Sequence, residues 1–224
     1  MSSKEASASF FVGGIMIGIH IYGVPPRMDN MRENAAKLPG AHIHIDDRYG
    51  QDHGCYPSLY TCRKAFLAPQ EEGETHRLVL QDDAELCDGF YEILQRMVRA
   101  HPDEILGLFP YCYPKRTEGL DNLDTPYIRS QFISGQAIVV PMWFIPKWDA
   151  WVRSAHPRGD IPDDTSIRLA AEAYGVKWLT TIPATVQHIG DNSLLNKGQG
   201  IRRTEYFCKN PQADWDSPKV APIQ

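Results

Sequence analysis

The chain has 224 residues, of which 42% are hydrophobic, and this is enough to form one large domain with a sizeable apolar core. Its formal net charge of -5 and pI of about 5.9 argue against nucleic-acid binding driven by overall charge, but they leave room for a local basic face. The five cysteines are odd in number and include no C-x-x-C pair, which indicates neither a complete disulfide framework nor a zinc ribbon. We therefore expect one domain over residues 1–224, in a bacterial cytoplasm or the cytoplasm of an infected host.

The apolar segment over residues 10–24 predicts a buried strand and not a membrane span. It is shorter than the roughly 20 residues that a spanning helix needs, and no basic n-region of a signal peptide precedes it. Isoleucines at every second position from Ile15 to Ile21 show the period of a strand that is covered on both faces. We expect no stable membrane insertion, and the oligomeric state stays open.

The rest of the chain alternates between strand and helix patterns. Helices are expected at residues 27–38, 57–67, 88–98, 147–154 and 163–174, and further strands at residues 41–45, 77–80, 104–109, 131–140 and 176–182. Residues 110–129 lack a clear period and predict a long loop over the ligand-binding end of the sheet. Residues 1–9 and 211–224 are expected to be loosely ordered. This order predicts an α/β fold, a Rossmann-like domain with a mostly parallel central sheet and helices on both faces.

An apolar run that ends abruptly in Asp82 and Asp83 is the most informative stretch of the chain. A buried strand that delivers carboxylates to the rim of a sheet can hold a divalent cation against a nucleotide diphosphate, because hard oxygen ligands suit Mg²⁺ or Mn²⁺. We interpret this pair as such a site, with Asp83 as the direct ligand and Asp82 directed to the ribose or to a metal-bound water. The alternative is a pair of solvated acids at a strand end or helix cap.

Four segments occur in a fixed order: a helix that starts at Arg27, the run Arg77-Leu-Val-Leu-Gln-Asp-Asp-Ala-Glu-Leu, the pair Asp163-Asp164, and Pro183-Ala-Thr-Val-Gln-His-Ile-Gly-Asp-Asn-Ser. This order resembles nucleotide-sugar glycosyltransferases of the GT-A fold, especially lipopolysaccharide-type and bacteriophage-encoded families. The segments resemble, in turn, the family's donor-binding start, its Asp-x-Asp or Glu-Asp-Asp signature, its acceptor-side acidic motif and its late His-x-Gly-x-x-Ser segment. One departure is Gln81, which stands where the family often has an acid.

The resemblance implies roles for further residues. His188 is expected to reach the metal or the diphosphate from the side opposite Asp83, and Gly135 is expected to form the turn under the donor sugar. An inverting transfer also needs a base, for which Asp164 is preferred over Asp163, although either acid is also a good helix start. Weaker candidates for donor binding are Arg27, Asp46, Asp47, Ser193 and Lys197.

The resulting hypothesis is a metal-dependent glycosyltransferase that takes a nucleoside diphosphate sugar, with a uridine diphosphate sugar as the expected donor. The acceptor is either a glycan or a hydroxymethylated base in phage DNA, for which a local basic face is available from Arg153, His156, Arg158, Arg202 and Arg203. A metal-dependent nucleotidyltransferase is an alternative, but it predicts a Gly-rich phosphate loop that Tyr-Gly-Val-Pro-Pro-Arg matches poorly. A non-catalytic sugar-binding module is a third possibility.

Overall fold

A seven-stranded sheet forms the centre of the computed structural model, which describes residues 14–110, 125–129, 134–190 and 203–221. Its strands are β1 (Ile17–Gly23), β2 (His42–Ile45), β3 (His76–Gln81), β5 (Ile105–Gly107), β6 (Tyr127–Arg129), β7 (Ala137–Pro141) and β8 (Trp178–Thr181). They follow the spatial order β2-β1-β3-β7-β5-β8-β6. A second, two-stranded sheet pairs β4 (Ala84–Leu86) with β9 (Val186–His188).

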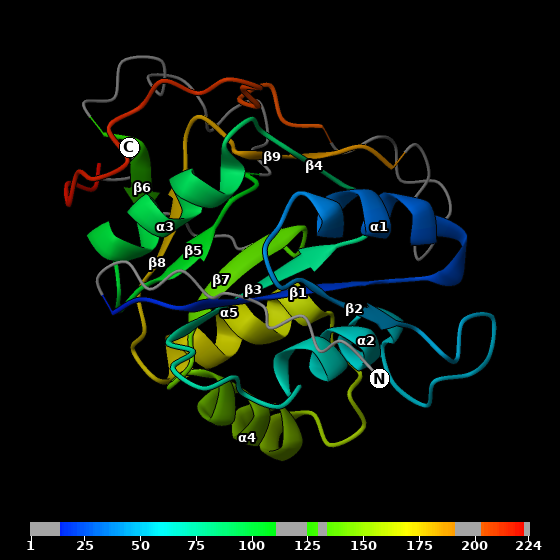
Figure 1. Ribbon diagram of the computed structural model, residues 1–224. Coiled ribbons are helices and arrows are strands. Elements are labelled where there is room, and N and C mark those ends of the chain that lie inside the picture. The colour runs from blue at the N-terminus through cyan, green and yellow to red at the C-terminus, as the bar shows by residue number, and fades with distance from the viewer. Residues whose placement is uncertain (1–13, 111–124, 130–133, 191–202, 222–224) are drawn as a thin grey trace.

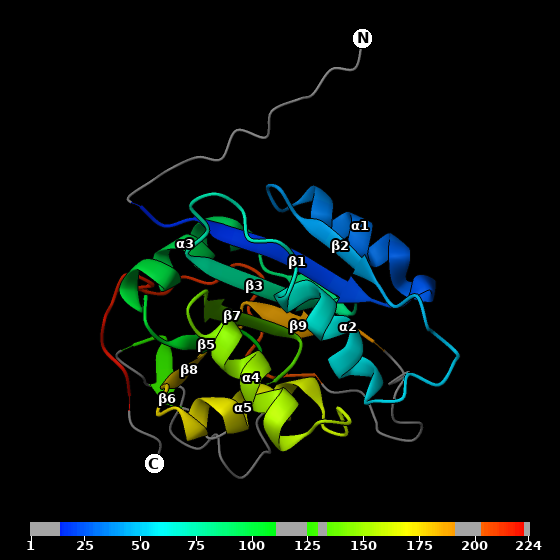
Figure 2. The same ribbon diagram turned by 90° about the horizontal axis from the view of Figure 1, so that it is seen from below.

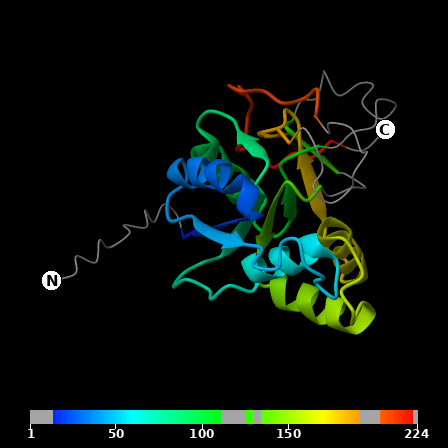
Figure 3. The ribbon, with the colours of Figure 1, turned by 90° about the vertical axis from the view of Figure 1, so that its right-hand side faces the viewer.

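Helices cover both faces of the main sheet, as expected (Figure 1). The short 3-10 helix η1 (Pro25–Arg27) leads into α1 (Met28–Ala36), which lies on one face with α3 (Phe90–Ala100). The other face carries α2 (Pro57–Phe66), α4 (Ile145–Ala155) and α5 (Asp163–Ala173), which lie in front of the sheet in Figure 2. Figure 3 shows the two helical layers from the side. In the described part of the chain, no helix is long and apolar enough to cross a membrane.

The alternation of side chains along β1 explains why both faces are covered. Ile17, Ile19 and Ile21 pack into the core under α1 and α3, whereas Tyr22 packs into the core under α2, α4 and α5. Successive side chains of a strand point to opposite faces, so a strand that is apolar on both faces needs a helical layer on each. The α/β class predicted from the sequence is therefore confirmed.

The expectation of a mostly parallel sheet holds only in part. The pairs β1–β2, β1–β3 and β5–β8 are parallel, but β7 is antiparallel to both β3 and β5, and β6 is antiparallel to β8. The sheet is therefore mixed. An apolar run reads the same in either direction, so the sequence pattern of β7 could not reveal its reversal.

Three short strands and the C-terminal segment were not predicted. β4, β6 and β9 have three residues each, which is too short for a period to show, and β6 lies inside the expected loop at residues 110–129. Residues 211–221 were expected to be loosely ordered, but Trp215 is buried and its carbonyl accepts a hydrogen bond of 2.6 Å from the Tyr127 hydroxyl. A buried aromatic anchor of this size fixes the segment to the domain.

A fully buried ion pair joins α2 to β3. Arg77 donates from Nε and Nη2 to the two carboxylate oxygens of Glu74, at 2.7 Å each, and from Nη1 to the carbonyls of Phe66 and Ala68, at 2.8 Å each. The Phe66 carbonyl is the last of α2 and that of Ala68 lies two residues beyond it, so neither has a partner within the helix. The guanidinium therefore satisfies Glu74 and the end of the helix together.

Three histidines lie on the face of β1 and β2 that α2 covers. His20 Nδ1 and His44 Nε2 are 2.8 Å apart, and the His20 ring stacks on His42 and His44. Burial, with the nearby Arg77 and neighbouring histidines, lowers the pKa of His20 to about 3. Burial and the same kinds of neighbour lower the pKa of His44 to about 4. Both rings are therefore neutral at neutral pH.

The contact between Gly18 and Glu74 predicts a large cost for Gly18→Ala. A Cβ at this position would lie 2.1 Å from Glu74 Oε1, and the carboxylate is held in place by Arg77. We expect the variant to lose about 2–4 kcal/mol of unfolding free energy in urea denaturation followed by circular dichroism, because it overpacks a buried ion pair.

Gly107→Ala is the matched control, because it places the same methyl group in another buried strand of the sheet. The nearest atom to that Cβ, Thr180 Oγ1, is 3.6 Å away, an ordinary contact, so the expected loss is below about 1 kcal/mol. Equal losses in the two variants would contradict the role given to Glu74.

Candidate active site

The carboxyl ends of β1, β2 and β3 lie together at one end of the sheet, which is called the carboxyl edge below. Tyr22 is the register partner of Gln81, and Gly23 is the register partner of Ile45. The Gln81 amide also donates to the carbonyl of Gln136, just before β7, at 2.8 Å. Residues that follow these strands therefore share this edge, which is where ligands bind in open α/β sheets.

Asp82 is held against the end of β1. Its Oδ2 accepts a 2.8 Å hydrogen bond from the Val24 amide, and its Oδ1 accepts a 3.0 Å bond from Arg27 Nη1. A Cβ on Gly23 would lie 2.2 Å from the Asp82 side chain, so only glycine allows this approach. The carboxylate is thus fixed by a backbone amide and a guanidinium.

Asp83 brings together Arg27 and His188. Its Oδ2 lies 2.5 Å from Arg27 Nη1 and 3.0 Å from His188 Nε2. His188 reaches it because β9 pairs with β4, which follows the acids directly and sets Ala84 opposite His188. Within the described part of the chain, two buried atoms here have no hydrogen-bond partner, Asp83 Oδ1 and His188 Nδ1. Unsatisfied buried polar atoms are costly, and a bound ligand or ion is one way to satisfy them.

The two acids differ in their ionisation. Burial, together with the charge of Asp83, raises the pKa of Asp82 above its ordinary value despite the Val24 and Arg27 contacts. Burial also acts to raise the pKa of Asp83, but hydrogen bonds and charges from His188 and Arg27 outweigh it, and this pKa is lowered. Burial acts to lower the pKa of Arg27, but both carboxylates outweigh it and raise this pKa. Asp83 is therefore the more firmly anionic of the two acids.

Asp163, in the first turn of α5, is buried and fully engaged by hydroxyl groups. Its Oδ2 accepts a 2.5 Å bond from Tyr22 and its Oδ1 accepts a 2.7 Å bond from Ser58. Gln81 Nε2 donates to the same Tyr22 hydroxyl at 2.8 Å, and burial raises the Tyr22 pKa well above its ordinary range. Asp163 thus ties α5 to β1, β3 and α2.

Asp164 is half-buried, and its Oδ1 accepts the Thr165 amide at 2.6 Å. The expected helix start is confirmed, because α5 begins at Asp163. Neither acid is the cap, however: the N-cap residue is Pro162, with no side-chain capping bond. The acids instead occupy the first turn, where the helix dipole favours negative charge.

Gly135 lies between Gln81 and the acidic pair Asp163–Asp164. A Cβ there would lie 3.0 Å from Gln81 Nε2, 3.2 Å from Asp163 Oδ2 and 3.6 Å from Asp164 Cβ. The turn predicted under the donor sugar therefore stands between the end of β3 and the start of α5. Residues from three separate parts of the sequence converge here.

The remaining predicted residues differ in their placement. The Asp46 amide donates to the Gly23 carbonyl at 2.8 Å, which puts Asp46 at the same edge, but its buried carboxylate pairs with His53 Nε2 at 2.8 Å. Asp47 is exposed and pairs with Lys64 of α2 at 2.7 Å. Ser193 and Lys197 lie outside the described residues.

Two asparagines of α1 support the acids and were not singled out from the sequence. Asn34 Nδ2 donates to the Ala84 carbonyl at 2.8 Å, and Asn30 Nδ2 donates to the Asp82 carbonyl. Their spacing of i and i+4 places both on one face of the helix. This spacing of two asparagines was the feature of the sequence that could have predicted their role. They hold the backbone that carries Asp82 and Asp83.

The described side chains at this edge could supply only some of the ligands of a metal ion. In the parts of the chain that the structure describes, no three or more His, Cys, Asp or Glu side chains are grouped to hold a metal. Asp83 Oδ2 and His188 Nε2 are 3.0 Å apart, and neighbouring ligands of an octahedral ion at about 2.1 Å are separated by about 3 Å. In the structure these two atoms are hydrogen-bonded to each other, so an ion held by both side chains would have to replace that bond and take its other ligands from phosphate oxygens and water.

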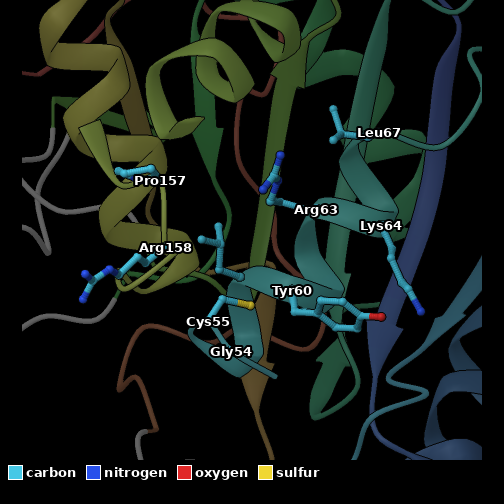
Figure 4. A pocket seen from close by; sticks show the side chains of 10 residues that line it. Gly54, Cys55, Tyr60, Arg63, Lys64, Leu67, Pro157 and Arg158 are labelled. Atoms are coloured by element: carbon cyan, nitrogen blue, oxygen red, sulfur yellow. The ribbon is translucent and has the colours of Figure 1, made fainter. Parts of the chain in front are cut away.

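A separate groove of about 610 Å³ runs between α2 and residues 157–159 (Figure 4). Its lining includes three basic residues, Arg63, Lys64 and Arg158, and no carboxylate. Arg63 pairs with Asp149 at 2.6 Å, and Lys64 with Asp47. None of the residues predicted from the sequence for donor, metal or base lines this groove.

No protein-family model and no curated protein matches the chain. Among solved structures, the chain is similar to "Crystal Structure of A197 from STIV", with 9% sequence identity and a TM-score of 0.44 over 87% of this chain and 98% of that chain. This similarity is too low to assign a family.

The network around Asp163 predicts a loss of stability for Tyr22→Phe. The change removes a donor from a buried carboxylate and leaves Gln81 Nε2 without its hydroxyl partner. We expect about 1–3 kcal/mol less unfolding free energy in urea denaturation. Tyr60→Phe is the control, since its hydroxyl bonds to Asp47 in an exposed contact, and a loss below about 0.5 kcal/mol is expected. Equal losses would contradict the importance of the buried network.

Proposed function

We propose that the chain is a metal-dependent glycosyltransferase of the GT-A type. It transfers a sugar from a nucleoside diphosphate sugar, with a uridine diphosphate sugar as the expected donor, to a hydroxyl acceptor. The observation that carries the proposal is the meeting of Asp83, His188 and Arg27 at the carboxyl edge of the parallel strands, where Asp83 Oδ1 and His188 Nδ1 lack partners. Cleavage of the donor leaves a negatively charged diphosphate, which nearby positive charge stabilises. Ligands of open α/β sheets bind at the carboxyl ends of the strands, where these residues lie.

The donor half of the site is assigned to the acids after β3. Asp83 and His188 would hold Mn²⁺ or Mg²⁺, and the bound ion supplies Lewis-acid stabilisation of the leaving diphosphate. Arg27 adds a guanidinium, whose planar fork suits phosphate oxygens. Asp82, held by the Val24 amide, is assigned to the ribose or to a metal-bound water.

The acceptor half is assigned to the start of α5. Asp164 is the proposed base, which takes the proton from the acceptor hydroxyl as the new glycosidic bond forms. Both oxygens of Asp163 already accept hydroxyl bonds, so this residue is assigned a positioning role. The assignment of a base applies to an inverting transfer; a retaining transfer does not need one.

The acceptor is proposed to be a glycan or a hydroxymethylated base in DNA, and a cytoplasmic location is proposed with it. A nucleotidyltransferase has less support, because the segment after β1 contains the 3-10 helix η1 and two prolines where a Gly-rich phosphate loop is expected. A sugar-binding module would bind the donor without releasing its diphosphate.

The metal assignment predicts the behaviour of Asp83→Ala. With Mn²⁺, the purified protein should slowly hydrolyse one uridine diphosphate sugar, and the variant should lose about 100-fold or more of this activity. It should also lose the Mn²⁺-dependent rise in melting temperature with nucleotide, because ligand binding stabilises only the folded state that binds it. Released uridine diphosphate and thermal shifts are the measurements.

Asp88→Ala is the control for this experiment. Asp88 lies five residues further along, is exposed, and contacts Lys209 at 3.9 Å. Its loss should leave hydrolysis and nucleotide binding unchanged. Normal turnover by the Asp83 variant would reject the metal assignment.

The base assignment predicts a different result for Asp164→Asn. Donor binding should stay within about threefold of the wild type, whereas transfer to an acceptor should fall about 100-fold, because a general base contributes about that much to the rate. Donor affinity is measured by isothermal titration calorimetry and transfer by product analysis. A loss of donor affinity would move Asp164 to the donor half of the site.

A further inference from the structure

The Arg27 guanidinium already occupies the place of a cation between the two acids. A single nitrogen, Nη1, lies 3.0 Å from Asp82 Oδ1 and 2.5 Å from Asp83 Oδ2. The two carboxylates are buried and adjacent in the chain, so without a positive charge between them they would repel each other at low dielectric. Arg27 therefore stabilises the acids when no other cation is bound.

The same oxygen is needed for the proposed metal. Asp83 Oδ2 lies 3.0 Å from His188 Nε2, so an ion held by these two side chains would draw on the same carboxylate that Arg27 contacts. A divalent ion at about 2.1 Å from Oδ2 would lie only about 4 Å from the guanidinium nitrogen, which is 2.5 Å from the same atom, so the two positive charges would repel each other. The metal and Arg27 therefore compete for the Asp83 carboxylate.

We propose that Arg27 is an exchangeable counter-ion, which competes with the divalent cation for Asp83 and leaves the acids when a diphosphate binds. The proposal rests on the proposed function, since it needs both a divalent cation and a diphosphate at this edge. The Arg27 side chain is 20% exposed, whereas the side chains of Asp82 and Asp83 are each 9% exposed. Arg27 therefore has a path toward solvent. A diphosphate offers the guanidinium charged oxygens in a geometry that it binds well.

Exchange of this kind couples the two ligands. Without nucleotide, an ion must displace Arg27 and leave its charge nearby, so binding of metal alone is weak. With nucleotide, the guanidinium moves to the phosphates, and the acids are free for the ion. Metal and nucleotide then strengthen each other's binding by the same factor, as linkage requires.

The test is Mn²⁺ binding to wild type and Arg27→Met, measured by isothermal titration calorimetry without nucleotide. The variant lacks the competitor, so it should bind Mn²⁺ alone about 10-fold more tightly than the wild type. Repeated with saturating uridine diphosphate, the same titration should show a smaller gain in Mn²⁺ affinity for the variant than for the wild type. This readout does not depend on catalysis.

Arg32→Met is the matched control. Arg32 lies on α1, is exposed, and contacts only Asp29 among the ion pairs of the described residues, at 3.7 Å. This variant removes an equal charge from the helix that follows Arg27 without touching the acids, so its Mn²⁺ affinity should stay within about twofold of the wild type, given screening at the surface. The difference between the two variants isolates direct competition.

Arg27→Lys covers the case in which Arg27→Met does not fold, which circular dichroism would reveal. It keeps the positive charge but loses the planar fork, so its Mn²⁺ affinity should lie between those of the wild type and the methionine variant. Equal Mn²⁺ affinity in wild type and the folded Arg27 variants would overturn the exchange and leave the metal site standing. If neither wild type nor variants bound Mn²⁺ with uridine diphosphate present, the metal-dependent function and the exchange would both be rejected.

Discussion

The close contact between the ends of β1 and β3 is the constraint on which the candidate site depends. The two strands are parallel and end in register, so the residues that follow them are neighbours. Gly23 has no side chain, and this lets the Asp82 carboxylate reach the Val24 amide. With Asp82 turned against β1, the next residue is directed toward Arg27 and His188. The direction in which the chain leaves β3 is thus set by a backbone contact.

The two acidic pairs are held from opposite faces of the sheet. Asp82 and Asp83 are supported by α1 through its asparagines, whereas Asp163 is held by Tyr22 and by Ser58 of α2. Arg77 and Glu74 anchor the far end of α2 to β3. Burial of a carboxylate is costly, and Asp82, Asp83 and Asp163 each accept contacts from nearby donors, while Asp83 Oδ1 and His188 Nδ1 have no partner among the described residues.

Local patterns predicted most of the elements and the edge of the sheet that carries the site. The long strands and helices have clear periods, and the acids at strand ends and in the first turn of α5 followed from them. Two kinds of information were not available locally. The pairing of β4 with β9, which brings His188 to Asp83, is a contact between distant three-residue segments. The different surroundings of Asp163 and Asp164 also depend on packing, since adjacent acids look alike in a sequence.

The stacked histidines of β1 and β2 make the stability of the fold depend on pH. In the unfolded chain His20 and His44 have ordinary pKa values near 6.5, but in the folded protein these fall to about 3 and about 4. Between these values the unfolded chain binds more protons than the folded one, so stability declines as the pH drops below about 6.5. The packing of the two rings between β1 and β2 therefore makes the folded state less stable in mild acid than at neutral pH.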